Sequence, residues 1–337
     1  MTNSHKTKLT FFLIATLTIL VGAFVFFAQS SGKESRLFTK ADAEKQVEQK
    51  QTQAPQEPQR QTATITFVGD MMFDRYVRQM ATTNGYDKIL ENLTTTLNKS
   101  DLVVGNLEGP ITTNESVSIT SEIGARNNFL FTFDPQITKT LVKNNIEVVN
   151  LGNNHARDFG QDGVEQTKKF LKDADIDFFG DTKDGQANRA LIKELNGMKI
   201  TFVNFNAFTK NAKQNTKDDI EAVKDKTDFL VVFTHWGQEY ETLSNDNQKN
   251  LARSWIDAGA DLVIGTHPHV VQEKEVYQGK TIYYSIGNFI FDQFFSTETK
   301  EGLIVKTTFH KEGEEKTITF EDQKVEMKPN GTTVLKE

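Results

Sequence analysis

The stretch ITFVGD, at residues 65–70, is an apolar run of β-branched and aromatic side chains that ends in a carboxylate. Four later segments repeat this pattern: LVVGNLE at 102–108, EVVNLGNNH at 147–155, FLVVFTHWGQEY at 229–240 and DLVIGTHPH at 261–269. Such runs predict buried strands. Amphipathic stretches among them predict helices at 135–144, 162–172 and 246–258. The alternation of the two patterns indicates an α/β fold.

Shorter β-type runs extend the expected sheet structure. The expected strands are 63–68, 102–105, 147–151, 177–179, 199–204, 229–234, 262–265, 281–285, 303–309 and 316–320. No internal repeat and no second linker interrupts residues 62–337. We therefore expect one folded domain over that range.

The composition excludes several classes of site. Hydrophobic residues make up 37% of the chain and charged residues 25%, as in folded domains. There is no Cys, which excludes disulfides, thiolate nucleophiles and Cys-ligated metal sites, so a metal would have to bind His, Asp, Glu or Asn. Residues 62–337 hold 31 Lys and Arg against 41 Asp and Glu, a net charge of −10. Because phosphate neutralisation needs a basic face, we expect no nucleic-acid partner.

The N-terminal region differs from the rest of the chain. Residues 9–28 are twenty residues without a charge, enough for a helix to cross a hydrocarbon core of about 30 Å. We expect an uncleaved single-pass anchor there, preceded by a short basic N-terminus at 1–8. A cleaved signal peptide is the alternative, but its apolar region usually has about 7–15 residues. The basic flank favours a cell-membrane protein whose domain lies on the extracytoplasmic side.

Residues 29–61, rich in Gln, predict a disordered linker.

Polar side chains follow five of the expected strands. They are Asp70, Glu108, Asn154, His155, His235, His267 and His269. Each has an ordinary explanation by itself, such as a turn, a helix cap or a hydrogen-bonded imidazole. Ligand sites of open α/β sheets, however, form outside the carboxyl ends of the strands, where these residues would meet. Oxygen and imidazole donors together suit Mn²⁺, Fe²⁺, Zn²⁺ or Mg²⁺, and one or two such ions are expected.

Individual roles follow from the chemistry of the side chains. A pair of ions about 3.5–4 Å apart needs a bridging carboxylate, for which Glu108 is the candidate. Asp158 lies close after His155 and can orient that imidazole as a proton donor. Arg75, shortly after Asp70, is a candidate for holding an anionic substrate group, although a surface helix charge is the alternative.

The order of the motifs resembles that of a known family. The motifs are GDMMFDR at 69–75, NLEGPI at 106–111, NLGNNHARDFG at 150–160, HWGQEY at 235–240, GTHPHVVQ at 265–272 and YSIGNFIFDQ at 284–293. They are similar to those of the CapA family of capsule-synthesis proteins, named for poly-γ-glutamate capsule biosynthesis, whose domain resembles the calcineurin-like metallophosphatases. The resemblance implies a four-layer α-β-β-α sandwich of the metallo-dependent phosphatase type, preceded by a membrane anchor.

The resemblance also implies a division of the metal ligands. It assigns Asp70 and His269 to one metal, Asn154, His235 and His267 to the other, Glu108 to a position between them, and His155 to the proton donor near the leaving group. Here the sequence departs from the metallophosphatase pattern, because Met72 stands where an imidazole is usual and Glu108 where an Asp is usual. A thioether is a poor ligand for hard cations, so the first metal site loses a donor.

Three hypotheses for function remain open at this point. The first is a membrane-anchored, extracytoplasmic CapA-like protein of capsule biosynthesis, which acts on an anionic polymer such as poly-γ-glutamate through a metal-dependent hydrolase or transferase site. The second is a non-catalytic accessory subunit that binds the other subunits of a membrane polymer synthase. The third is an extracytoplasmic metallophosphoesterase for a phosphate-containing substrate.

Overall fold

The computed structural model describes residues 60–336 except 119, 121, 123, 181 and 183–188. The predicted basic N-terminus, the predicted anchor and almost all of the predicted linker lie outside the described residues. Among the helices in the described part of the chain, none is long and apolar enough to cross a membrane. The described residues all fall within one unit, Pro58–Glu337.

The first sheet is mixed and has eight strands. They are β1 (Gln61–Met71), β2 (Leu102–Leu107), β3 (Ile146–Asn150), β4 (Asp177–Phe179), β11 (Asn288–Ile290), β12 (Glu301–Glu312), β13 (Glu315–Met327) and β14 (Thr333–Leu335). The order is β14-β13-β12-β1-β2-β3-β4, with β11 also beside β1. Strands β1 to β4 are parallel, whereas β12 to β14 continue the sheet in antiparallel pairs.

The second sheet has six strands in the order β5-β6-β7-β8-β10-β9. They are β5 (Ala190–Leu195), β6 (Met198–Asn206), β7 (Phe229–His235), β8 (Leu262–Thr266), β9 (Lys274–Tyr277) and β10 (Lys280–Tyr283). The four central strands are parallel, and β5 and β9 pair antiparallel at the two edges. Strands β6, β7 and β8 are almost wholly buried because both faces of the sheet are covered.

The two sheets pack face to face, and the alternation of side chains in β1 explains how. Ile65 and Phe67 enter the core between the sheets, while Val68 enters the core on the opposite face. The Phe67 ring centroid lies 6.3 Å from those of Phe202 in β6 and Phe233 in β7. Aromatic contacts at this spacing add to the free energy gained by burying apolar surface.

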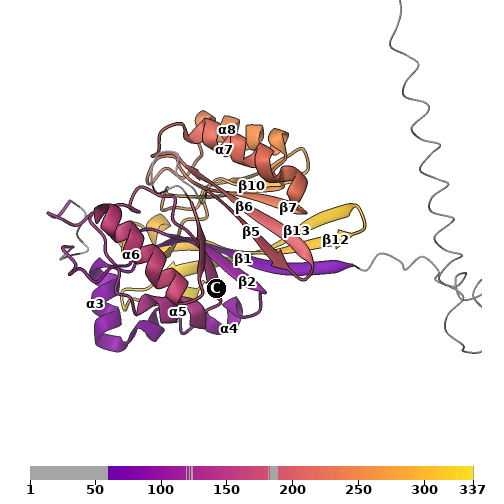
Figure 1. The fold of residues 1–337 in the computed structure, drawn as a ribbon. Helices are drawn as coiled ribbons and strands as arrows, with labels where there is room; N and C mark the ends of the chain where they lie inside the picture. The colour runs from indigo at the N-terminus through magenta and orange to yellow at the C-terminus, as the bar shows by residue number, and fades with distance from the viewer. Residues whose placement is uncertain are drawn as a thin grey trace, which may run out of the picture. The chain divides into compact units, whose positions relative to one another are not determined.

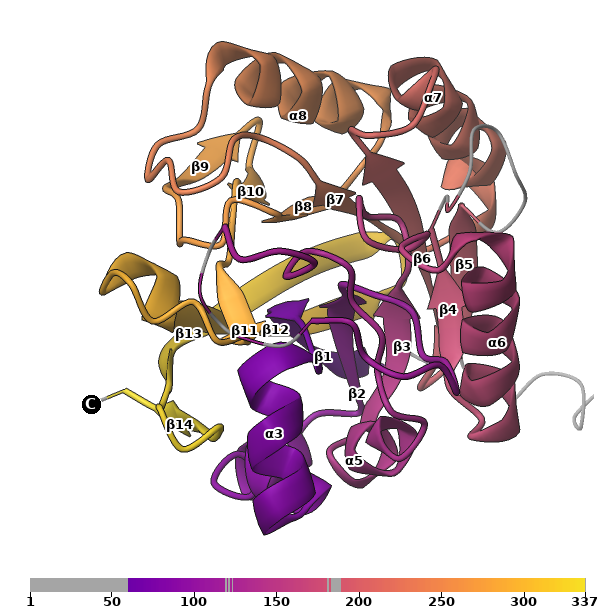
Figure 2. The same ribbon diagram turned by 90° about the vertical axis from the view of Figure 1, so that its left-hand side faces the viewer.

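Helices cover the two outer faces of this pair of sheets, as Figure 1 and Figure 2 show. The longer helices are α3 (Arg75–Asn84), α5 (Ile137–Lys143), α6 (Gly160–Asp173), α7 (Ala212–Val223) and α8 (Asp246–Ala258); α4 (Thr94–Leu97), η1 (Tyr86–Ile89), η2 (Lys224–Lys226) and η3 (Glu298–Lys300) are short. Leu141 and Leu171 anchor α5 and α6 on the first sheet, and Ile220 and Trp255 anchor α7 and α8 on the second. The α/β sandwich predicted from the sequence is thus confirmed.

Every strand expected from the sequence is present, and so are the three expected helices. The additional strands β5, β9, β11 and β14 and the helices α3, α4 and α7 were not predicted. Strands β11 and β14 have only three residues each, and β9 alternates exposed with half-buried side chains at a sheet edge. Patterns this short or this polar resemble those of loops. Pairing with neighbouring strands in the tertiary structure, and not local propensity, makes these segments strands.

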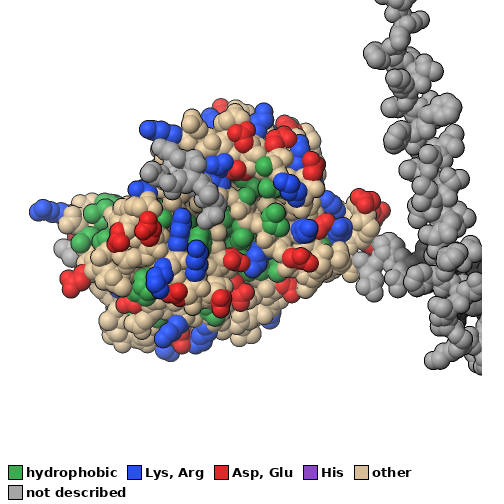
Figure 3. Space-filling model, in the orientation of Figure 1, with side chains coloured by type: hydrophobic (Ala, Val, Ile, Leu, Met, Phe, Trp, Pro, Cys, Tyr) green, Lys and Arg blue, Asp and Glu red, His purple; other side chains and the backbone are tan. Residues whose placement is uncertain are grey.

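The surface of the molecule on the side drawn in Figure 3 carries acidic and basic side chains intermingled. Several of them form exposed ion pairs, such as Lys193–Asp177 at 2.7 Å and Lys306–Glu321 at 2.9 Å. Exposed pairs of this kind contribute little to stability. The free energy of folding therefore depends mainly on the three apolar cores.

Candidate metal centre

The predicted ligands come from the carboxyl ends of parallel strands in both sheets. Asp70 lies near the end of β1, where the pairing register with β2 and with β11 is irregular. Glu108 follows β2, and Asn154 follows β3 by a few residues. His235 is the last residue of β7, and the segment with His267 and His269 follows β8 directly. Because β7 and β8 face the first sheet, segments far apart in sequence deliver side chains to one place.

One group of donors combines two carboxylates and an imidazole. The ligand atoms of Asp70, Glu108 and His269 all lie within 4.8 Å of one another, and all three residues are buried. His269 Nδ1 is 3.3 Å from Asp70 Oδ2, and His269 Nε2 is 3.6 Å from Glu108 Oε1. The structure thus brings together the residues expected to form the first metal site and its bridge.

A second group combines two imidazoles and an amide. His235 Nε2 lies 2.8 Å from Asn154 Oδ1 and 3.2 Å from His267 Nδ1. The backbone N–H of His267 donates to Asp70 Oδ2 at 3.1 Å, which links this group to the first. The residues expected to form the second metal site therefore meet as well, although their role as ligands stays a prediction.

Hydrogen bonds from neighbouring residues orient the imidazoles. Both N–H groups of Asn288 are used, donating to Gln293 Oε1 and to the carbonyl of Thr299, so its Oδ1, 3.0 Å from His269 Nδ1, acts as the acceptor there. The hydroxyl of Thr266 donates to the carbonyl of Thr234, so it accepts from His235 Nδ1 at 3.0 Å. A proton on Nδ1 leaves Nε2 of each ring free to bind a metal.

The backbone at the two neighbouring histidines is in an uncommon conformation. His267 has φ +96° and His269 has φ +59°, on either side of Pro268. Positive φ is costly for residues other than glycine, and such strain is found mostly at functional sites. Here it directs both imidazoles into the donor groups.

Burial and mutual charge shift the pKa of these side chains. Burial raises the pKa of Glu108 well above its usual value, and the charge of Asp70 raises it further. Burial opposes ionisation of Asp70 too, but His269 and then His235 hold its pKa well below the usual range. Burial and the nearby His267 lower the pKa of His235, while burial and His269 lower that of His267 to about 3. The imidazoles of His235 and His267 are therefore neutral at pH 7, the form that binds metals.

The donor set fits a divalent metal ion. Glu108 Oε1 is buried and has no hydrogen-bond partner among the described residues. An unpaired buried carboxylate oxygen beside a second buried carboxylate is costly unless a cation is bound. Imidazole, carboxylate and amide oxygen donors in one place suit Mn²⁺, Fe²⁺, Zn²⁺ or Mg²⁺.

His155 and Asp158 lie in the turn between β3 and α6. His155 Nδ1 is 2.8 Å from Asp158 Oδ2, which also accepts the backbone N–H of Phe131 at 2.8 Å. The Phe131 ring covers the imidazole, with 4.2 Å between ring centroids. Both polar side chains are only slightly exposed. This pair has the geometry of an imidazole held by a carboxylate with Nε2 left for proton transfer.

Arg75 is the first residue of α3 and is buried, so it is not the surface helix charge that was the alternative. Its guanidinium is buried, pairs with Asp292, and donates to the carbonyl of Asn128 at 3.3 Å. The rings of Phe131 and Phe291 lie 5.1 and 5.3 Å from its guanidinium carbon. The Arg75 guanidinium is therefore already paired with Asp292. Direct binding of a substrate anion by Arg75 stays a prediction.

Two polar residues of the site were not picked out from the sequence, although both belong to quoted motifs. Asn106, in NLEGPI, donates to Asp70 Oδ1 at 2.8 Å and to Glu108 Oε2 at 3.3 Å. Glu239, in HWGQEY, forms with His267 and His269 a further group whose ligand atoms all lie within 4.8 Å of one another. Only their position beside expected ligands in the motifs could have pointed to them.

Met72 lies in the apolar core on the helix side of the first sheet. Its side chain is fully buried, and its sulfur accepts the backbone N–H of Asp74 at 3.0 Å. The thioether thus fills space and accepts a hydrogen bond in the position where the metallophosphatase pattern has an imidazole.

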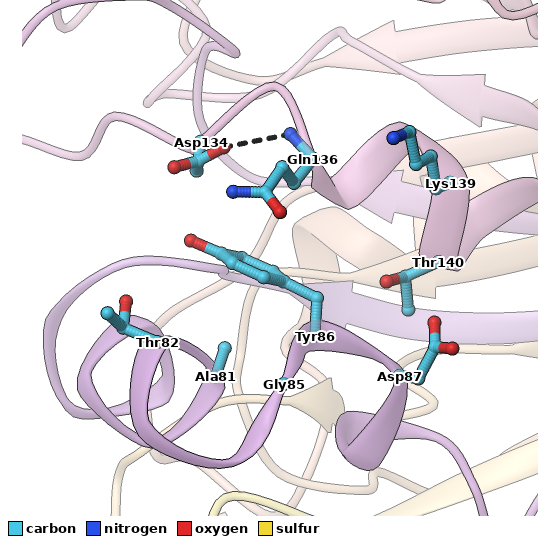
Figure 4. Close-up of a pocket in the computed structure, with 9 residues that line it drawn as sticks. All are labelled: Ala81, Thr82, Gly85, Tyr86, Asp87, Asp134, Gln136, Lys139 and Thr140. Atoms are coloured by element: carbon cyan, nitrogen blue, oxygen red, sulfur yellow. Dashed lines mark hydrogen bonds between the residues drawn. The ribbon is translucent and has the colours of Figure 1, made fainter.

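A separate hollow of about 450 Å³ lies beside α3, η1 and α5 (Figure 4). The ring of Tyr86 lies across it, facing Gln136 and Asp134, and the carboxylate of Asp134 accepts the backbone N–H of Gln136. None of its lining residues belongs to the donor groups. This hollow is therefore separate from the donor groups.

Fold and donor groups together define an α/β sandwich protein with side chains that can hold a divalent metal. Residues 64–293 match the family described as bacterial capsule synthesis protein PGA_cap, and the chain belongs to that family. The resemblance to capsule-synthesis proteins seen in the motifs is thereby confirmed.

Several known proteins are similar to this chain. The PGA biosynthesis protein CapA of Bacillus subtilis is 35% identical over 74% of this chain and 68% of its own length. The capsule biosynthesis protein CapA of Bacillus anthracis is 32% identical over 72% of this chain and 63% of its own. A probable polyglutamine synthesis accessory protein of Mycobacterium tuberculosis is 27% identical, over 60% and 58%. Among solved structures, TT1561 of Thermus thermophilus matches with a TM-score of 0.42 at 7% identity, over 77% of this chain and 99% of that one.

Proposed function

We propose that this protein acts in capsule biosynthesis, as a membrane-anchored, extracytoplasmic CapA-like protein with a metal-dependent hydrolase-like site of the metallophosphatase type. The observation that carries the proposal is the meeting of six donors from both sheets, which are Asp70, Glu108, Asn154, His235, His267 and His269. Membership of the capsule synthesis family supports the biological setting. The names of the two Bacillus relatives support the same setting.

The substrate proposed is an anionic polymer such as poly-γ-glutamate, or another phosphate- or carboxylate-bearing molecule. A divalent metal, held by the six donors, would supply Lewis acidity at the scissile bond. The acidic domain itself repels an anion. A bound metal ion would neutralise the charges of Asp70 and Glu108, and this would make the site attractive to such a substrate.

The residues of the chain contribute proton transfer and orientation. Asp158 holds Nδ1 of His155, so that Nε2 is the atom that can give a proton to a leaving group. The ring of Phe131 excludes water from one face of that imidazole. Asn106 fixes the two carboxylates relative to each other through its two hydrogen bonds.

A second candidate function is a non-catalytic accessory subunit of a membrane polymer synthase. Two observations favour it. Met72 replaces an imidazole of the metallophosphatase pattern with an apolar side chain, and the mycobacterial relative is named as a probable accessory protein. In this function the same donor groups would bind carboxylates without turnover.

The experiment combines metal analysis with capsule output. The purified full-length chain is analysed for bound metal and assayed with Mn²⁺ against poly-γ-glutamate and an aryl phosphodiester. His235→Ala and His267→Ala are then tested for capsule production in cells, with His310→Ala, outside the donor groups, as the control.

Each outcome selects one function. Loss of metal, of polymer cleavage or transfer, and of capsule output in the two site variants supports the catalytic proposal. Loss of metal with full capsule output contradicts it. Capsule output that depends on the chain but not on its metal supports the accessory subunit, and turnover of the phosphodiester without effect on polymer supports a metallophosphoesterase.

The proposed location rests on residues 9–28 of the sequence. We expect the full-length chain to fractionate with membranes and to be degraded by protease added to intact cells from which the wall has been removed. A chain that starts at Pro58 should fractionate with soluble protein and keep its metal. Full protection of the full-length chain from external protease would place the domain on the other side.

A further inference from the structure

Glu239 reaches the donor cluster from the outside. Its carboxylate and the imidazoles of His267 and His269 place their ligand atoms within 4.8 Å of one another. Glu239 is exposed, whereas the two histidines are buried. An exposed carboxylate could remain in water, away from other side chains. The proximity of the Glu239 carboxylate to two imidazoles therefore needs a structural cause.

The loop after β7 supplies that cause. Gly237 has φ +92° and Tyr240 has φ +67°, so the chain turns sharply on both sides of Glu239. The backbone N–H of Tyr240 donates to the carbonyl of Pro268 at 2.8 Å. This bond ties the loop to the residue between the two histidines, and it holds Glu239 over them.

The side chain of Tyr240 fixes the loop a second time. Its hydroxyl accepts from Gln293 Nε2 at 3.3 Å, and Gln293 also accepts from Asn288, the residue that orients His269. The Tyr240 ring lies 6.2 Å from that of His269. The loop that carries Glu239 is therefore part of the framework that orients the ligands.

The donor group of Asp70, Glu108 and His269 has fewer protein ligands than the metallophosphatase pattern. Its expected set lacks one imidazole, because residue 72 is Met, and the Met72 side chain lies in the apolar core. The Oε1 atom of Glu108 also has no hydrogen-bond partner among the described residues. Carboxylate oxygen is a good ligand for Mn²⁺, Mg²⁺ and Fe²⁺, so a carboxylate can replace the missing nitrogen for these metals.

We propose that Glu239 is a further ligand of the metal centre, which binds a divalent cation together with His267 and His269 from the solvent side. The inference rests on the metal centre of the proposed function. It adds a ligand from outside the set expected from the metallophosphatase pattern, and it makes the centre richer in carboxylate.

The test measures Mn²⁺ binding to the full-length chain by isothermal titration calorimetry and by electron paramagnetic resonance. Glu239→Gln keeps the size of the side chain and removes its charge. We expect it to weaken Mn²⁺ binding about tenfold or more at one site, while Glu239→Asp retains part of the affinity. Glu241→Gln is the matched control, because Glu241 lies in the same loop, is exposed and belongs to no donor group.

The outcomes separate this inference from the function on which it rests. Glu241→Gln should bind Mn²⁺ within about twofold of the unaltered chain; an equal loss in both variants would indicate only a general charge effect and overturn the inference. Unchanged binding in Glu239→Gln, with binding lost in His267→Ala, would also overturn it but leave the metal centre standing. If Asp70→Asn and His267→Ala both bind Mn²⁺ normally, the metal centre itself fails.

A structural role for Glu239 is tested by a further readout. If the carboxylate only stabilised the loop, Glu239→Gln would lower the melting temperature of the metal-free chain. As a ligand it should leave that temperature unchanged and reduce only the rise that Mn²⁺ produces. A fall in the metal-free melting temperature that accounts for the whole loss of affinity would contradict the proposal.

Discussion

Glu108 is the residue on which the electrostatics of the donor cluster depend most. It is fully buried next to Asp70, and one of its oxygens has no hydrogen-bond partner in the described part of the chain. Asn106 donates to both carboxylates and so partly screens them from each other. Without a metal, the folded state is most stable when Glu108 holds a proton.

This predicts that Glu108→Gln stabilises the metal-free chain. A carboxyl whose pKa is raised on folding contributes stability below its unfolded pKa of 4.5, and this contribution is lost as the pH rises through the folded pKa. We expect Glu108→Gln to raise the free energy of unfolding by about 1–3 kcal/mol at pH 8 and by less at pH 5. Urea unfolding in the presence of a chelator measures both values. Glu147→Gln, at an exposed position in β3, should change neither, and a destabilised Glu108→Gln variant at pH 8 would refute the argument.

The buried pair of Arg75 and Asp292 gives a second prediction at this scale. Arg75→Met leaves the Asp292 carboxylate buried without its cation, although the backbone N–H of Tyr76 still donates to it at 3.0 Å. We expect a loss of about 3–5 kcal/mol in the free energy of unfolding. Lys169→Met, which removes the cation of the exposed Lys169–Asp173 ion pair, should cost less than about 1 kcal/mol.

Chemical denaturation of both variants checks this expectation. The double variant Arg75→Met/Asp292→Leu removes both charges and should recover part of the loss. A small effect of Arg75→Met would mean that the pair is not needed for stability, and it would strengthen the sequence-based hypothesis that Arg75 serves a substrate.

At the scale of elements, the parallel pairing of β1 with β11 positions two parts of the site. The backbone N–H of Asp70 donates to the carbonyl of Gly287 at 3.1 Å, and Asp70 pairs with Asn288 in register. A Cβ atom on Gly69 would lie 1.8 Å from the Gly287 oxygen. Gly69 is therefore required by the close approach of two backbones and not by its φ angle.

Gly69→Ala should separate these strands. We expect a loss of about 3 kcal/mol in the free energy of unfolding, because backbone atoms cannot yield as a side chain can. Gly85→Ala is the control: its φ is +96° but a Cβ there meets no atom within 4 Å, so it should cost about 1 kcal/mol. The Gly69→Ala variant should also bind Mn²⁺ more weakly, since Asp70 and Asn288 move. Equal costs for the two variants would contradict the steric argument.

At the scale of the whole domain, the donor groups connect the two sheets. Asp70 and Glu108 come from the first sheet, and His235, His267 and His269 come from the second. A metal that binds both sets stabilises the folded state relative to the unfolded chain, which cannot present the same cluster.

We therefore expect Mn²⁺ to raise the melting temperature of the chain. At a free concentration about 100 times the dissociation constant, the gain is about 2.7 kcal/mol, or roughly 5–10 °C for a domain of this size. Calorimetry with Mn²⁺ and then with excess chelator measures the rise and its reversal. His235→Ala should reduce the rise and His310→Ala should keep it. An unchanged melting temperature in the unaltered chain would count against a metal shared by the two sheets.

Local sequence patterns sufficed to predict much of the fold and most of the candidate ligands. Runs such as 65–70 and 229–235 predict their strands because continuous apolar β-branched and aromatic residues mark strands buried on both faces. The same runs identify the candidate ligands, because the carboxyl ends of parallel strands converge. Short strands such as β11 escaped prediction, since three residues carry too little pattern.

By itself, then, the sequence determined the α/β class, the family and the list of candidate ligands, all of which depend on residue type and local spacing. Only the tertiary structure decided which of these side chains meet, that Arg75 pairs with Asp292, and that Glu239 joins the cluster. The physical reason is distance along the chain: the N–H of His267 and the carboxylate of Asp70 are 197 positions apart, and only the packing of two sheets brings them to 3.1 Å.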